Sequence, residues 1–194
     1  MKKQPEVTAA TRQKLIDAFW SVFTTKDIDK ITIAEITRIA EYNRGTFYEY
    51  FVDIYDLLDQ VEDDLILQVK GQIEDILEKD FPKDFPKDLS SYSLKCAKIF
   101  RQYEDKIFVL LGPHGDPKFH TKLQDAFLTV FNQYAIIPED IQNLDYLITF
   151  AFSGIVGMLT HWYEKGKDLT EDEFVKMVQT LVAVGAVGYT KESL

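Results

Sequence analysis

Apolar residues recur at helical spacing along almost the whole chain, and no stretch alternates like a strand between hairpin turns. In the first long stretch, 8–25, four apolar residues share one face: Leu15, Phe19, Val22 and Phe23. A shorter stretch that begins at Thr32 places three on its inner side: Ile36, Ile39 and Ala40. The pattern predicts an all-helical protein of about nine helices.

Polar residues stand where these helices should begin. Thr32 and Glu35 have the spacing of a capping box, in which each side chain binds a free amide of the first turn. Asn43 is a good N-cap for a third helix, which should run through residue 51, and Asp53 for a fourth, 54–78. The first four helices are therefore long, short, short and long.

A proline-rich segment, 79–87, interrupts the helical pattern and is expected to be a linker. A second break at 112–115 should end where Asp116 caps a helix that has Pro117 at its first position. Thr170 is a candidate cap for the last helix. The pattern after the linker predicts five helices: 89–103, 105–111, 117–134, 139–165 and 171–191.

The third helix carries the candidate chemistry. Phe47 and Phe51 lie at i and i+4 and should pack inward against the first two helices. An arginine on the opposite face can bind guanine, a threonine can contact a base edge, and tyrosine hydroxyls can donate to phosphates. Glycine allows the backbone to approach DNA closely. The predicted DNA contacts are Thr32, Asn43, Arg44, Gly45, Thr46, Tyr48 and Tyr50.

The same spacing permits a simpler interpretation. Residues 31–57 could be three short helices with a tyrosine-rich surface, since helix-turn-helix geometry also occurs without DNA binding. The formal net charge of the chain is −10. Residues 1–60 contain 8 Lys or Arg and 10 Asp or Glu, a balance of −2, so the acid is concentrated in the remainder. Charge alone does not favour a nucleic-acid partner.

Other classes of function find little support. Cys96 is the only cysteine, which excludes an internal disulfide and fits a cytoplasmic location. The uncharged stretch 146–163 is diluted by polar residues and favours a buried helix over a membrane span. No metal-ligand spacing, nucleophile motif or phosphate loop is present, so we expect no enzyme, no metal and no cofactor.

Residues 9–60, and the segment RGTFYEYF above all, resemble the N-terminal module of the TetR (tetracycline-repressor-like) family. The later segments GPHGDP and SGIVGMLTHWYEKG are similar to the family in layout. This resemblance implies a helix-turn-helix DNA-binding domain, 1–53, and a helical ligand-binding and dimerisation domain, 54–194. It also implies operator binding by a homodimer, repression more than activation, and release by a small molecule.

Three departures from the family's pattern stand out. Glu41-Tyr42 replaces the common Gly–Val of the turn, so a left-handed residue there would be strained by roughly 1 kcal/mol. Tyr50 stands where a histidine is common. Ile54 stands where the family has a phosphate-binding lysine. The loss of that lysine, together with Glu49 and the −2 balance of residues 1–60, predicts weak nonspecific binding and a modest dependence on salt.

The later helices suggest a pocket and an interface. Small residues at close-packing spacing predict a two-fold dimer interface that includes Ser153, Gly157, Val182 and Gly185, although an ordinary core would show the same pattern. Aromatic residues could line a cavity for an apolar or aromatic effector, although they too could simply be core. The candidates are Phe100, Tyr103, Phe108, Phe119, Phe127, Phe131 and Phe150.

The leading hypothesis is thus a ligand-responsive, dimeric DNA-binding regulator of double-stranded operator DNA, with no membrane partner. The alternative is a co-regulator of the same fold that takes its signal from a partner protein through the acidic C-terminal surface. An aromatic cavity too small for a ligand would favour this alternative.

Overall fold

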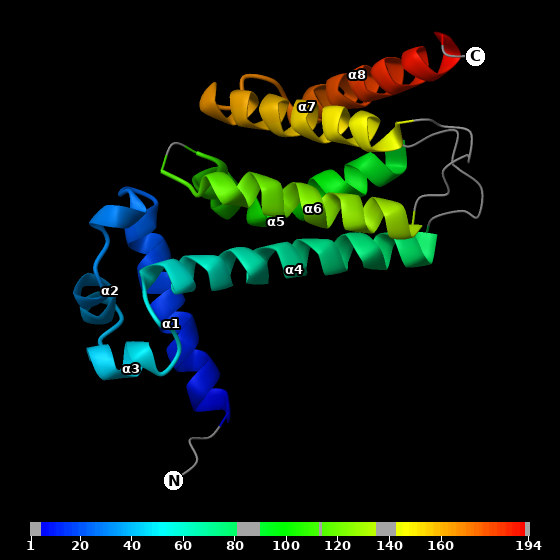
Figure 1. Ribbon diagram of the computed structural model, residues 1–194. Helices are drawn as coiled ribbons and strands as arrows, with labels where there is room; N and C mark the ends of the chain where they lie inside the picture. The colour runs from blue at the N-terminus through cyan, green and yellow to red at the C-terminus, as the bar shows by residue number, and fades with distance from the viewer. Residues whose placement is uncertain (1–4, 81–89, 113, 135–142, 193–194) are drawn as a thin grey trace. The chain divides into compact units, whose positions relative to one another are not determined.

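The computed structural model describes residues 5–80, 90–112, 114–134 and 143–192. Within these ranges all regular structure is helical, which confirms the predicted fold class (Figure 1). The elements are α1 (Pro5–Phe23), η1, a 3-10 helix (Ile28–Lys30), α2 (Ile33–Ile39), α3 (Arg44–Tyr48), α4 (Ile54–Asp80), α5 (Ser90–Leu111), α6 (Pro117–Tyr134), α7 (Leu144–Glu164) and α8 (Glu171–Glu192).

The chain packs as two compact units, each with its own core. The first unit consists of residues 1–65 and 109–119, and the second of residues 66–108 and 120–194. The first therefore includes the beginning of α4 and the segment between α5 and α6. A functional boundary at residue 53 stays a prediction.

The core of the first unit is built on the inner faces of α1, α2 and α3. Phe19 and Phe23 stack with their ring centroids 5.0 Å apart, and the rings of Phe47 and Phe51 lie 5.3 Å apart. All four side chains are buried, as the spacing predicted. Ile39, expected on the inner side of α2, is instead 40% exposed. At 100° per residue it points well away from the direction shared by the buried Ile36 and Ala40.

Side chains cap the helices of the first unit where predicted. The Thr32 hydroxyl accepts a hydrogen bond from the Glu35 amide at 3.2 Å, and the Asp53 carboxylate accepts one from the Asp56 amide at 2.8 Å. The expected reciprocal bond from Glu35 to Thr32 is wrong, because the Glu35 carboxylate accepts from Lys26 Nζ at 2.7 Å instead. Only half of the predicted capping box therefore forms.

In the second unit, α5 is one helix, whereas the pattern predicted two, 89–103 and 105–111. Residues 104–105 contain no glycine or proline, so nothing in the backbone ends the helix there. Most of the predicted linker, 79–87, and the first residues of the predicted helix 139–165 lie outside the described residues.

Helices α7 and α8 pack against each other within the second unit. Trp162 stacks on Phe174 with ring centroids 4.5 Å apart, and Phe108 of α5 stacks on Tyr163 at 3.8 Å. Two ion pairs join α5 to the α7–α8 turn and the start of α8: Glu104–Lys167, at 2.7 Å, and Arg101–Glu171.

Among the helices of the described ranges, none has both the length and the apolar character that a membrane span requires.

The turn between α2 and α3 forces a non-glycine residue into a left-handed conformation. The Tyr42 amide donates to the Thr37 carbonyl at 2.9 Å, and the Glu41 amide donates to the Arg38 carbonyl at 3.4 Å. This is a Schellman motif, whose left-handed position usually holds glycine. Here that position is Glu41, with φ 60°. The strain expected from the sequence is therefore present.

The turn after α5 has no room for a side chain at Gly115. Its amide donates to the Gly112 carbonyl at 3.0 Å, which folds the chain back onto the end of α5. A Cβ on Gly115 would lie 1.8 Å from the carbonyl oxygen of Leu110. This segment therefore depends on glycine for steric reasons.

Replacing Glu41 with glycine should raise the free energy of unfolding by roughly 0.5–1 kcal/mol, because the strain is relieved and only part of the gain is lost to a more flexible unfolded chain. Glu49→Gly is the matched control, since Glu49 caps α3 with φ −74° and gains nothing from glycine. Urea unfolding measures both. Equal shifts in the two variants would contradict the assignment of strain to Glu41.

Gly115→Ala should lower the free energy of unfolding by about 1–3 kcal/mol, because the added methyl group meets backbone rather than a movable side chain. Gly71→Ala provides the comparison. Gly71 lies within α4 and its Cβ would meet nothing within 4 Å, so alanine should raise the stability by up to about 1 kcal/mol. Thermal unfolding of the two variants should move in opposite directions.

Candidate nucleic-acid interface

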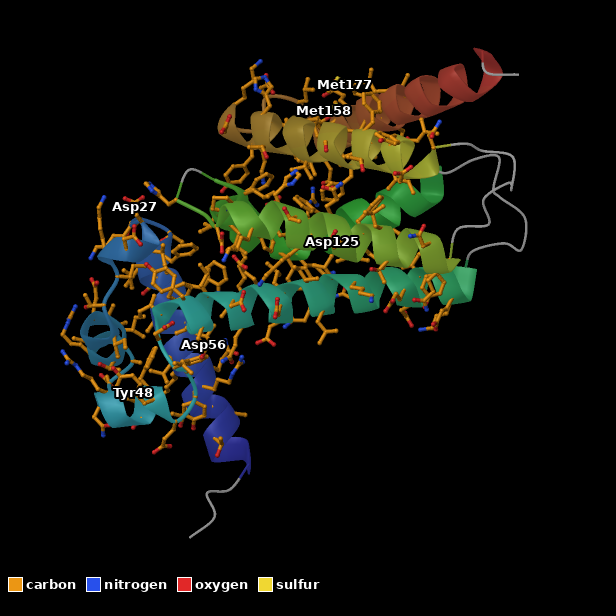
Figure 2. The ribbon with its side chains drawn as sticks, viewed as in Figure 1. Asp27, Tyr48, Asp56, Asp125, Met158 and Met177 are labelled. Atoms are coloured by element: carbon orange, nitrogen blue, oxygen red, sulfur yellow. The ribbon has the colours of Figure 1, made fainter. Side chains whose placement is uncertain are left out.

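The five-residue helix α3 presents one face to solvent and buries the other. Phe47 is fully buried, whereas Arg44 and Gly45 are exposed and Tyr48 is 58% exposed. Figure 2 labels Tyr48 on α3. Arg44 and Tyr48 lie one helical turn apart, so they project side by side from the exposed face. This face can enter a groove without disturbing the core.

Asn43 holds the first turn of α3 through its side-chain oxygen. That oxygen accepts hydrogen bonds from the Thr46 amide at 2.9 Å and from the Thr46 hydroxyl at 3.3 Å. A Cβ on Gly45 would lie 3.1 Å from the same oxygen, closer than an ordinary contact. Glycine at 45 therefore protects the cap as well as leaving the backbone accessible.

The structure gathers six of the seven predicted DNA contacts around α3. Asn43, Arg44, Gly45 and Tyr48 are exposed, and Thr46 and Tyr50 are half-buried. Thr32 is also exposed, but it lies at the opposite end of α2, where its hydroxyl caps that helix. These residues remain predicted contacts, and their exposure is compatible with that role.

A chain of polar contacts links η1 to the segment between α5 and α6. His114 Nδ1 lies 2.5 Å from Asp27 Oδ1, and Lys30 Nζ lies 2.5 Å from Asp27 Oδ2. The hydrogen bond from Lys30, and then that from His114, holds the pKa of the Asp27 carboxyl below its usual value. No spacing rule joins residues 87 positions apart, so sequence reasoning missed this contact.

The start of α4 is surrounded by carboxylates and has no cation. Ile54 is only 7% exposed and belongs to the core. The Tyr55 hydroxyl donates to Asp29 at 2.6 Å, and this contact raises the pKa of the phenol. The Val52 amide donates to Asp56 at 2.7 Å. The departure noted at Ile54 thus leaves no basic side chain at this helix start.

The seven aromatic residues proposed for a pocket do not form one set. Phe119 is fully buried in the first unit, whereas the others belong to the second. Phe100 packs edge-on against Phe108, with ring centroids 5.6 Å apart, and Phe127 lies 5.4 Å from Phe152. Phe150 is 65% exposed. The Phe131 side chain lies outside the described residues. The observed ring contacts are those of a packed core.

An opening of about 520 Å³ lies elsewhere in the second unit, beside α4 and α5. Tyr103 stands nearby, because its hydroxyl accepts a hydrogen bond from Gln72 Nε2 at 2.6 Å. Sequence reasoning missed this opening, although two glutamines and a glycine on the apolar side of a long helix were a signal. Its lining consists of Leu67, Gln68, Gly71, Gln72, Asp75, Ile76 and Ile99.

The predicted interface residues lie on the two last helices. Ser153 and Gly157 are exposed on α7. Val182 and Gly185 lie within α8, but their side chains are outside the described residues. Figure 2 shows Met158 on α7 and Met177 on α8, which pack as neighbours.

Two family models match this chain, one in the first unit and one mostly in the second. Residues 15–61 match the family of bacterial regulatory proteins called the tetR family, and residues 87–183 match a transcriptional regulator C-terminal region of tetR type. The chain is 30% identical over 76 residues to an uncharacterised helix-turn-helix-type transcriptional regulator of Bacillus subtilis, YvdT. That alignment spans 39% of each chain, so it covers well under half of the relative.

Several solved structures share the fold. A TetR transcriptional regulator from Streptococcus agalactiae has a TM-score of 0.64 and 23% identity, over 91% of this chain and 96% of that one. A TetR-family regulator from Syntrophomonas wolfei has a TM-score of 0.66 and 21% identity, over 92% and 96%. The regulator LfrR from Mycobacterium smegmatis, solved in complex with proflavine, has a TM-score of 0.53 and 19% identity, over 90% and 96%.

The matches to both parts of the family together span most of the chain, and they fall on the helices whose geometry is described above. This chain belongs to the tetR family of bacterial regulatory proteins and is a DNA-binding transcriptional regulator.

Proposed function

We propose that the protein is a dimeric cytoplasmic repressor that binds operator DNA through α3 and is released when a small molecule binds the part of the chain after residue 53. The observation that carries this proposal is the exposed face of α3, formed by Arg44, Gly45 and Tyr48 on a helix that the buried Phe47 holds in place. The family membership supports the same role.

In this proposal α3 lies in the major groove and reads base edges. The Arg44 guanidinium can bind guanine O6 and N7 together, which is the commonest specific contact in the major groove. The hydroxyl of Tyr48 can donate to a backbone phosphate, as can that of the half-buried Tyr50. Gly45 allows the α3 backbone to approach the bases closely. Thr46 can contact a base edge, and the contacts proposed at Thr32 and Asn43 position the helix-turn-helix on the DNA backbone.

The dimer interface in this proposal is the exposed side of α7 together with α8. Tyr146, which is 73% exposed, Phe150, Ser153 and Gly157 follow one another at helical spacing along α7. Met177 and Leu181 are exposed on α8. Two helices from each protomer would cover these apolar side chains as a four-helix interface. The exposure of Phe150 favours this place for it over a place in a cavity.

The effector in this proposal occupies the opening beside α4 and α5. Its volume, about 520 Å³, suits a small molecule, and its lining combines apolar side chains with two glutamines and Asp75. The proflavine complex of LfrR supports an aromatic occupant for a protein of this fold. Helix α4 runs unbroken from Ile54 to Asp80. A ligand that binds better to one position of this helix therefore changes the fraction of dimers whose two helix-turn-helix modules can bind DNA.

The protein should bind double-stranded DNA from the region upstream of its own gene, and Arg44→Ala should weaken that binding by about 1–3 kcal/mol and relax the preference at one base position. Lys176→Ala, an exposed cation on α8, is the control and should leave binding unchanged. Gel-shift titration measures all three proteins. Absence of any shift by the wild type at low salt would count against DNA binding.

The wild type should sediment as a dimer at micromolar concentration, and Phe150→Glu should sediment as a monomer, because a carboxylate in the apolar interface loses its hydration. Leu67→Glu is the control, since Leu67 is equally exposed but lies on α4. Circular dichroism checks that the variants keep their helices. A monomeric wild type, or a dimeric Phe150→Glu protein, would refute the proposed interface.

A further inference from the structure

Few basic side chains of the helix-turn-helix region lack a partner within the described part of the chain and can therefore bind DNA. Residues 5–65, which include the helix-turn-helix, contain six basic residues: Arg12, Lys14, Lys26, Lys30, Arg38 and Arg44. Lys118 lies in the other segment of the unit, 109–119. Attraction between a protein and DNA depends on how many phosphates its cations neutralise and how many counterions are released. The partners of these six side chains within the chain therefore decide how strongly residues 5–65 attract DNA.

Both lysines near the start of α2 are neutralised within the chain. Lys26 Nζ lies 2.7 Å from Glu35 Oε1, and Lys30 Nζ lies 2.5 Å from Asp27 Oδ2. Such exposed pairs contribute little to stability, but each pair has no net charge. A phosphate would have to compete with a carboxylate for either ammonium group.

The two basic residues of α1 are engaged with other helices. Arg12 Nη2 lies 2.9 Å from Asp64 Oδ2 and donates to Gln60 Oε1 at 3.0 Å, which ties α1 to α4. The ammonium group of Lys14 lies over the ring of Tyr42, 6.0 Å from its centroid. These side chains hold helices together and would have to leave those contacts to reach DNA.

Arg38 and Arg44 differ from the other four. Both are exposed, and no hydrogen bond, ion pair or ring contact engages either side chain within the described residues. Arg44 is already assigned to base contact on α3. Arg38 lies in the last turn of α2, the first helix of the helix-turn-helix, and in such modules this helix crosses the DNA backbone.

We propose that Arg38 binds a backbone phosphate of the DNA and supplies the phosphate contact that is missing at Ile54. The planar guanidinium suits this task, because it can donate two parallel hydrogen bonds to phosphate oxygens. Lys26 and Lys30 contribute little while Glu35 and Asp27 hold them. The inference rests on the proposed DNA binding, and it adds a residue that base recognition by α3 does not require.

The test is the salt dependence of binding to duplex DNA from upstream of the protein's own gene and to a scrambled duplex of equal length. Arg38→Gln should reduce the slope of log K against log salt by about 0.9 for each protomer bound. It should weaken binding to both duplexes by a similar factor, because a phosphate contact carries no sequence information. Arg38→Lys keeps the charge and should restore most of the slope.

Glu35→Gln provides a test in the opposite direction. Removing the Glu35 carboxylate frees Lys26, so the slope should increase and binding to the scrambled duplex should become tighter. A misfolded variant would not gain affinity, which makes this result independent of any loss of stability.

The outcomes separate the two proposals. If the wild type binds and Arg38→Gln keeps its slope, or loses affinity only for the upstream duplex, Arg38 is not a phosphate contact while the proposed function stands. If the wild type binds neither duplex at low salt, the proposed function fails and the role of Arg38 fails with it.

Discussion

The burial of Phe47 and Phe51 is the constraint on which the exposed face of α3 depends. A helix of five residues is too short to form by itself in water, since nucleation costs more than one or two hydrogen bonds return. Burial of each phenyl ring contributes roughly 1.5–3 kcal/mol, and the Asn43 cap adds about 1 kcal/mol. The rings also determine how α3 is rotated. The direction of Arg44 and Tyr48 is therefore a consequence of hydrophobic packing.

Local signals in the sequence predicted much of the first unit. The caps at Thr32, Asn43 and Asp53 act within three residues, and the inward face of α3 follows from one helical period, so the residue pattern alone is enough to predict both. Glu35 was predicted wrongly because its partner, Lys26, lies nine residues away. Nothing in a spacing rule decides whether a carboxylate turns to its own helix or to a neighbouring loop.

The candidate pocket was harder to predict, for a physical reason. Core and cavity walls both consist of apolar residues at helical spacing, and only the distances between rings distinguish them. Phe108 lies against Tyr163 at stacking distance, and Phe119 belongs to the other unit. The opening beside α4 is marked instead by Gln68, Gly71 and Gln72, which interrupt an apolar stripe. Polar interruptions were the more informative signal here.

The small space around Gly45 has a consequence for how this regulator can evolve. Any side chain at that position would press on the oxygen of Asn43 that holds the first turn of α3. In the proposed DNA complex it would also keep the backbone away from the bases. Thr46 is committed to the same cap. If α3 binds DNA as proposed, a change of operator preference that leaves the fold intact therefore depends mainly on Arg44, because Tyr48 is assigned to a phosphate. Relatives that bind other operators should then differ first at the position of Arg44.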